Sequence, residues 1–246
     1  MARNVPDLRL ALAAMSTPDI RDPMFMSAPI LGTSKPHRIA VCTRSPGYQA
    51  DPEVQDSLRR AAKLLANAGY QIEEVEPPRL REAADLWLSL TMNDTRALLE
   101  ESMLAGGDEA LIVAYQGMLA NAPLLSLQSY IQAQATRITL QRDWAIFLDR
   151  YPLLMLPTSW RTPFAVDLDQ ADAAVMHAIL EAQSPLLSTA ILSLPGLAVP
   201  MGSVNGVPGG VHLVAARFNE TLCLDAAEAI DAQRGPIMPV DPVLGD

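Results

Sequence analysis

A strand–helix–strand unit near the start of the chain restricts the possible folds more than any other feature of the sequence. Residues 38–42 form a short apolar strand, residues 71–75 read as a second strand, and a helix with one apolar face fits between them. That helix has a strong start at Asp51-Pro52, where the Asp51 carboxylate can accept from the first free amides. Gly69 suits the left-handed residue that ends such a helix. Because connections of this kind nearly always join parallel strands, the unit predicts an α/β fold.

The rest of the chain alternates helices with short apolar strands. The run 153–156 is apolar throughout and ends at Pro157, which is typical of a strand buried on both faces. Residues 194–202 and 206–214 predict two more strands, joined by a turn between Gly202 and Gly206. Helices are expected over residues 5–15, 80–104, 108–119, 126–149 and 171–187, with a last helix capped by Asn219 and closed by Gly235.

These elements predict one α/β domain over residues 1–246, with a mixed β-sheet flanked by helices. Residues 1–77 would hold a helix and the strand–helix–strand unit. Residues 78–150 would be the helical region, and residues 151–246 would supply core strands and the final helices. The chain is half hydrophobic, and a domain of this size buries about 70% of the surface its unfolded chain exposes.

Composition limits the binding partners and the cellular compartment that we expect for this chain. No stretch of about 20 apolar residues is present, so we expect no membrane span. The first residues lack a secretory signal, and a cytoplasmic location is the expectation. The net charge is −10 and no basic stripe occurs, which argues against nucleic acid as a partner.

The cysteines and histidines do not predict a metal site. Cys42 and Cys223 lie in apolar surroundings and are expected to be buried free thiols. With His37, His177 and His212 they form no metal-ligand spacing, and no phosphate-binding or dinucleotide-binding fingerprint occurs. We therefore expect no metal and no cofactor.

Five segments, taken in order, resemble the amidase-signature family, whose members hydrolyse carboxamide bonds. They are Ala2–Leu8, similar to an "A-R-x-V-x-D" helix start; Pro18–Pro23, similar to a "D-P-R-D-P" turn; the unit over 38–75; Leu153–Thr158, similar to "L-L-x-P-T"; and Leu194–Gly202 with Gly206–Leu213, similar to a late "G-L-P-A-x-S-V-P-x-G … G-L-P-x-G-x-Q" pair.

One local departure from the family is His212, which stands where the family often has Gln. A functional His there would be sensitive to pH near neutrality. The simpler interpretation is a strand residue whose ring nitrogen has a hydrogen-bond partner.

The resemblance implies a catalytic lysine, a bridging serine and a serine nucleophile in a Gly/Ser-rich segment, and that apparatus precedes the helix at which this chain begins. The two lysines of this chain are Lys35 and Lys63. We expect Lys63 on a helix surface and Gly32-Thr33-Ser34-Lys35 in a loop. A Gly-x-Ser-x-Gly elbow is absent. Carboxylates that are neighbours in the sequence point to different faces of a strand or helix, so they do not converge on one site. We therefore assign no catalytic residue and expect the chain alone to be inactive.

The resemblance also implies that this half supplies walls of the acyl-side pocket, with ordinary core packing as the alternative for each residue. The predicted pocket residues are Trp87, Met92, Trp160, Phe164 and Leu192.

Three hypotheses remain open for the chain as a whole. It is the C-terminal half of an amidase shortened by truncation or an internal start, one subunit of a split amidase, or a non-catalytic binding or structural module. The expected partners are a small-molecule amide once a catalytic half is present, and an N-terminal partner chain or a second copy that covers an exposed sheet edge. The sequence does not indicate which amide.

Overall fold

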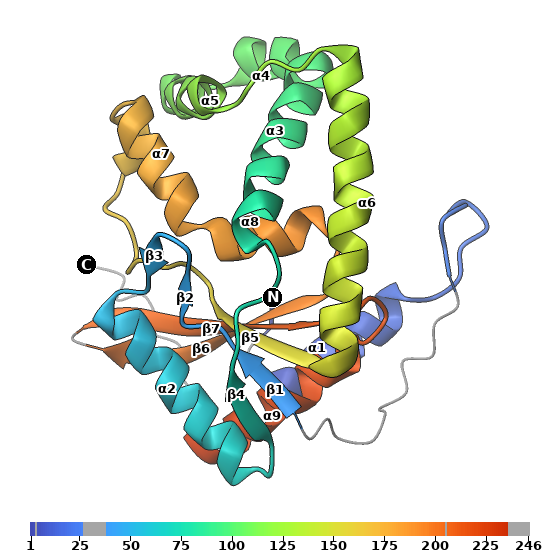
Figure 1. The fold of residues 1–246 in the computed structure, drawn as a ribbon, viewed down its shortest axis with the longest axis vertical. Helices are drawn as coiled ribbons and strands as arrows, with labels where there is room; N and C mark the ends of the chain where they lie inside the picture. The colour runs from blue at the N-terminus through green and yellow to red at the C-terminus, as the bar shows by residue number, and fades with distance from the viewer. Residues whose placement is uncertain (3, 27–37, 205, 236–246) are drawn as a thin grey trace, which may run out of the picture.

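A mixed sheet forms the centre of the structure, a computed structural model that describes residues 1–2, 4–26, 38–204 and 206–235. Its strands are β1 (Arg38–Val41), β4 (Gln71–Glu74), β5 (Leu153–Pro157), β6 (Gly196–Val204) and β7 (Val207–Ala215). Within the described residues the order is β4–β1–β5–β7–β6 (Figure 1). The first three are parallel, and the β6–β7 hairpin continues the sheet in antiparallel fashion.

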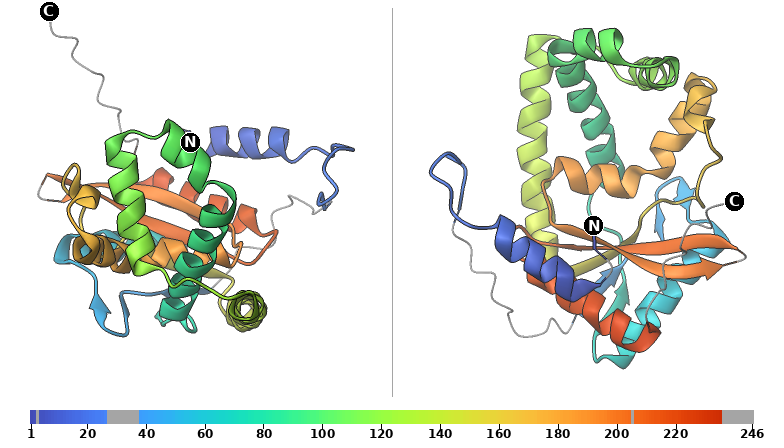
Figure 2. Two further views of the ribbon diagram at one scale, coloured as in Figure 1. Left: turned by 90° about the horizontal axis from the view of Figure 1, so that it is seen from above. Right: turned by 180° about the vertical axis from the view of Figure 1, so that it is seen from behind.

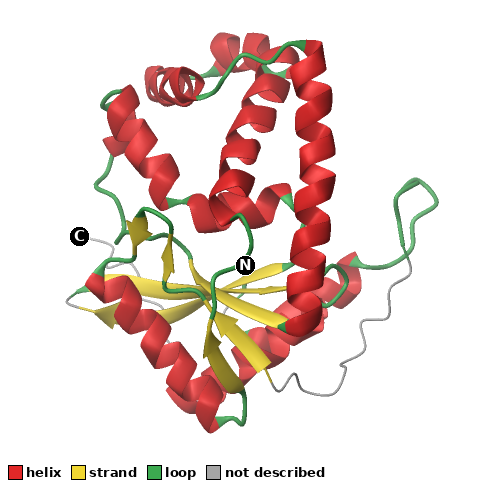
Figure 3. Cartoon of the chain, viewed as in Figure 1, coloured by secondary structure: helices red, strands yellow, loops and turns green. Residues whose placement is uncertain are grey.

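Helices cover both faces of this sheet (Figures 2 and 3). One face carries α1 (Val5–Met15), α2 (Pro52–Asn67) and α9 (Glu220–Arg234). The other carries α3 (Leu80–Leu98), α6 (Leu127–Arg150) and α8 (Ser184–Ile191). Farther from the sheet lie α4 (Glu100–Gly106), α5 (Glu109–Asn121), the short 3₁₀ helix Leu168–Gln170 and α7 (Ala173–Ala182).

The core lies on both sides of the sheet because strand side chains alternate between its faces. Ile39 and Val41 of β1 pack toward α2 and α9, whereas Ala40 and the adjacent Cys42 pack toward α3 and α6. All five residues of β5 are buried. Burying one such leucine contributes about 1.5–3 kcal/mol, so the central strand fixes the two helical layers on the sheet.

The strand–helix–strand prediction is confirmed. β1 and β4 pair in parallel, with Ile39 opposite Ile72, and Gly69 after α2 has a φ of 94°. The predicted strand after residue 152 is also confirmed, and it occupies the centre of the sheet between β1 and β7.

Several local predictions need correction. The helix expected over 80–104 is divided at Leu99, and the one expected over 171–187 is divided at Gln183, two residues before Pro185. A proline ring conflicts with a continuous helix, which accounts for the second division. Gly202 lies in an irregularity of the hairpin, not in its turn, because β6 and β7 pair again beyond it at Ser203 and Pro208.

A small ribbon also escaped the sequence patterns. β2 (Arg44–Ser45) pairs with β3 (Tyr48–Gln49) between β1 and α2. Each strand has two residues, too few to show an alternation of polar and apolar side chains.

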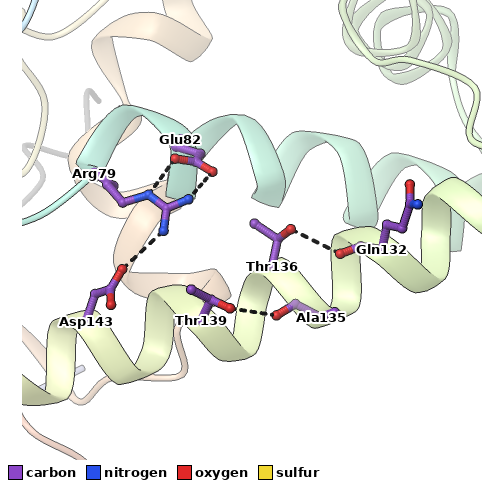
Figure 4. A network of polar contacts seen from close by, with 7 residues as sticks. All are labelled: Arg79, Glu82, Gln132, Ala135, Thr136, Thr139 and Asp143. Atoms are coloured by element: carbon purple, nitrogen blue, oxygen red, sulfur yellow. Dashed lines mark hydrogen bonds and ion pairs between the residues drawn. The ribbon is translucent and has the colours of Figure 1, made fainter.

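Arg79 fastens the start of α3 to α6. It has a φ of 51°, a left-handed conformation that is costly for a residue with a side chain. Its guanidinium donates to Glu82 at 2.7 Å and to Asp143 of α6 at 3.1 Å (Figure 4). These contacts hold the two long helices together above the sheet.

The two cysteines are buried free thiols, as predicted. In the part of the chain that the structure describes, no helix has both the length and the apolar character needed to cross a bilayer.

Candidate functional site

A cleft opens where β5 ends, between the first turns of α2, the start of α8 and the tip of the β6–β7 hairpin. Its volume is about 300 Å³. In α/β folds, ligands bind outside the carboxyl ends of the parallel strands, and this cleft has that position relative to β5. The lining residues are Glu53, Val54, Ser57, Thr158, Ser159, Arg161, Thr162, Pro163, Phe164, Gln183, Leu186, Val207, Pro208, Gly209 and Gly210.

The lining combines an apolar body with a few polar groups. Val54, Phe164 and Leu186 give it apolar walls, and Gln183 and Arg161 add an amide and a cation. Pockets for small molecules have this composition, with polar groups that orient a mainly apolar ligand. The cleft therefore offers both apolar and polar contacts to a small ligand.

Two serine hydroxyls of the cleft donate to backbone carbonyls. Ser57 Oγ donates to the carbonyl of Glu53 at 3.2 Å, and Ser159 Oγ donates to the carbonyl of Ala182 at 3.3 Å. The described residues that line the cleft include no lysine or histidine that could take a proton from either hydroxyl.

The loop after β5 forms one wall and is fastened on two sides. The backbone N–H of Trp160 donates to the carbonyl of Ala182 at 2.8 Å, and its indole N–H donates to Ser184 Oγ at 2.9 Å. On the other side, the backbone N–H of Asp51 donates to the carbonyl of Trp160 at 2.8 Å. Trp160 thereby connects the end of α7 and the start of α8 with the start of α2, and the cleft lies between them.

The structure brings one of the five predicted pocket residues to this cleft. Phe164 is half-buried and lines it. Trp160 and Leu192 are fully buried in the core on the α3–α6 side, and Trp87 packs against that core. Met92 is buried within α3. The substrate role of all five stays a prediction.

Sequence reasoning missed most of the lining, including Ser57, Gln183 and the hairpin residues 207–210. Ser57 and Gln183 occupy ordinary helical and helix-end positions, so nothing local marked them. Gly209-Gly210 was a usable signal, because neighbouring glycines in a strand indicate close approach of another group. A β-carbon on Gly209 would lie 2.3 Å from Ser57 Oγ.

His212 lies on β7, outside the lining of the cleft, and faces α8. Its ring is accommodated by Gly196, where a β-carbon would lie 2.4 Å from His212 Cε1. Nε2 lies 3.4 Å from Thr189 Oγ1, whereas Nδ1 is buried without a hydrogen-bond partner among the described residues. The predicted hydrogen-bond partner is thus present for Nε2, whereas Nδ1 has none among the described residues. Burial lowers the His212 pKa from 6.5 to about 4, so the ring is neutral at pH 7.

The two lysines offer no base in the described part of the chain. Lys63 lies on the exposed side of α2, as expected. Lys35 and the Gly32-Thr33-Ser34 cluster lie outside the described residues. Among the described residues, no group of three His, Cys, Asp or Glu side chains is placed to hold a metal ion.

Comparison with known families identifies the scaffold. Residues 1–224 match the family described as Amidase. The chain belongs to the amidase family. It is 36% identical over 239 residues to an indoleacetamide hydrolase of Bradyrhizobium diazoefficiens, covering 96% of this chain and 45% of that protein. It is 25% identical over 264 residues to a glutamyl-tRNA(Gln) amidotransferase subunit of Bacillus pumilus, covering 94% of this chain and 53% of that protein.

Solved structures of amidase-type proteins share the fold. Fatty acid amide hydrolase superposes with a TM-score of 0.77 at 19% identity, over 96% of this chain and 47% of that one. Kluyveromyces lactis allophanate hydrolase gives a TM-score of 0.75 at 21% identity, over 94% of this chain and 38% of that one. The amidase chain therefore spans about half the length of the curated relatives it matches.

Proposed function

We propose that this chain is the C-terminal half of an amidase scaffold, which takes part in hydrolysis of a carboxamide C–N bond when an N-terminal catalytic half is present. The carrying observation is the family match over residues 1–224 together with a cleft whose described lining offers binding groups but no lysine or histidine. Acyl transfer by a serine needs a base and donors for the oxyanion. We accordingly expect the chain alone to be inactive.

The substrate we propose is a small amide with an apolar body. Indoleacetamide is the first candidate, because the indoleacetamide hydrolase of Bradyrhizobium is 36% identical to this chain. A cleft of about 300 Å³ lies at the lower end of the range for small-molecule sites, which favours a compact ligand. Phe164 and Leu186 would contact its ring, and Gln183 is a candidate for its polar end.

Truncation of a longer amidase and a split amidase both fit this proposal, and both require an N-terminal segment to cover the remaining surface. The alternative is a protein without catalytic activity, a binding or structural module. We propose a cytoplasmic location for all three. A catalytic half should restore hydrolysis for a truncated or a split amidase and should not do so for a non-catalytic module.

The test is a fusion. The segment of the Bradyrhizobium indoleacetamide hydrolase that precedes the part matched by this chain would be joined upstream of Met1. Ammonia release from indoleacetamide would be measured for the fusion, for this chain alone and for the added segment alone. We expect hydrolysis by the fusion and none by either part.

Two results would count against the proposal. Hydrolysis by this chain alone would show that its chemistry is self-contained. A fusion that melts cooperatively, yet neither binds nor hydrolyses small amides, would favour the non-catalytic module. Hydrolysis on mixing the separate parts would favour the split amidase within the proposal.

A further inference from the structure

Asp51 departs from the role that its position predicts. It stands at the N-cap of α2, yet its side chain accepts no hydrogen bond from the first amides of that helix, all of them described residues. Oδ2 instead accepts from the backbone N–H of Thr162 at 3.1 Å, and Oδ1 lies 3.5 Å from Nη1 of Arg161. Residues that depart from such a strong local preference are often part of a functional site.

We propose that Asp51 is a positioning residue of the cleft, which holds the loop wall of residues 161–164 against α2. The proposal rests on the proposed function, since it gives Asp51 a part in shaping the site for the amide. Asp51 itself is not among the lining residues, so it acts through the residues that are.

The contacts join two walls of the cleft through one residue. The Asp51 carboxylate bonds to Thr162 two residues before Phe164, and its backbone N–H bonds to the carbonyl of Trp160. On the other side, Asp51 is two residues before Glu53, where the α2 part of the lining begins. A shift of the Asp51 carboxylate would therefore change the spacing between α2 and the ring of Phe164.

The two carboxylate contacts differ in strength. The side chain of Arg161 is 57% exposed, so its ion pair with Asp51 is screened by water. The bond from the Thr162 N–H ends on a charged oxygen, and such bonds are stronger than neutral ones. The Thr162 contact is thus the main one, and an asparagine at position 51 would keep an oxygen for it.

This difference separates positioning from helix capping. Serine and asparagine cap helices about equally well, so a capping role predicts that Asp51→Ser and Asp51→Asn behave alike. The serine side chain is one atom shorter and does not reach Thr162 from the same backbone. A positioning role predicts that asparagine rescues and serine does not.

The first measurement is amide hydrogen exchange at Thr162 in the full chain. We expect exchange about tenfold faster in Asp51→Ser and Asp51→Ala, as for loss of one hydrogen bond, and close to the parent rate in Asp51→Asn. The matched control is Asp108→Ser in α5, because Asp108 does cap its helix, accepting from Leu111 N–H at 2.8 Å. That control should leave Thr162 unchanged.

The second measurement is the kinetics of the fusion protein with indoleacetamide. We expect Asp51→Ser to raise KM about tenfold with a smaller change in kcat, and Asp51→Asn to stay near the parent. Equal behaviour of the serine and asparagine variants in both measurements would overturn the proposal. If the parent fusion melts cooperatively but neither binds nor hydrolyses small amides, the proposed function fails, and the exchange pattern at Thr162 alone decides the role of Asp51.

Discussion

The hydroxyl of Ser57 on α2 occupies the place that a β-carbon on Gly209 of β7 would take. Such a carbon would lie 2.3 Å from Ser57 Oγ and 3.5 Å from Ser57 Cβ. Ser57 is fully buried, so the helix and the hairpin tip meet here without room for an added atom. This contact sets the distance between two walls of the cleft.

Gly209→Ala is therefore expected to destabilise the chain by about 1–3 kcal/mol through overpacking. Ser57→Ala should restore much of this loss in the double variant, because the obstructing atom is the hydroxyl oxygen and the Cβ contact is of ordinary length. Urea unfolding of the two single variants and the double variant gives the coupling free energy. Strict additivity would show that the two residues do not meet as described.

Trp160→Phe is expected to lower the free energy of unfolding by about 1–3 kcal/mol, because it leaves Ser184 Oγ buried without its indole donor. In the completed protein, the same change should alter affinity for an amide as the loop shifts. Trp87→Phe is the matched control for the unfolding measurement, since Trp87 is only partly buried. Denaturation and ligand titration distinguish this positioning effect from direct contact with substrate, which predicts lost affinity at unchanged stability.

Phe164→Ala should show the opposite pattern. Its side chain is half-buried and lines the cleft, so truncation should cost little stability and weaken binding of an aromatic amide about tenfold. The KM of the fusion for indoleacetamide and for a small aliphatic amide checks this. Equal losses for both amides would exclude Phe164 as a determinant of selectivity.

His212 should make stability fall below neutral pH. Its folded-state pKa of about 4 lies below the ordinary 6.5, so the unfolded chain binds the extra proton first. The stabilising contribution is complete above pH 6.5 and is lost as the pH falls toward 4. Between pH 7.5 and pH 5 this amounts to about 2 kcal/mol.

Urea unfolding of the parent and of His212→Gln at the two pH values isolates this contribution. The glutamine variant should lose about 2 kcal/mol less than the parent. His177→Gln on α7 is the control for replacing an exposed histidine by glutamine. A pH dependence that survives His212→Gln would assign it to other groups.

The two thiols should be unreactive in the folded chain. Burial raises the pKa of Cys42 and of Cys223 to about 12, and each Sγ donates to a backbone carbonyl. At pH 8 the thiolate fraction is then negligible, and iodoacetamide should modify neither residue until urea unfolds the chain. Mass spectrometry of the native and unfolded samples checks this, and rapid native labelling at either position would contradict the packing described.

Local and periodic signals were sufficient for the sheet and most of its helices. The parallel pairing of β1 with β4 followed from one helix between two short strand segments, and the buried centre of β5 followed from four apolar residues before Pro157. Each signal is contained in neighbouring residues, so no knowledge of the rest of the fold was needed. The same signals placed Gly69 at the end of α2, where only the chain's own geometry matters.

The cleft was decided by tertiary contacts that no neighbouring residues record. Asp51 and Asn219 have the chemistry of helix caps, yet in the described structure neither side chain caps its helix. Trp160 is buried, and its indole donates to Ser184, 24 positions away in the chain. The sequence by itself determined most of the elements, their order and the amidase resemblance. Only the tertiary structure decided which side chains meet at the end of β5, because those meetings depend on distances between segments that lie far apart in the chain.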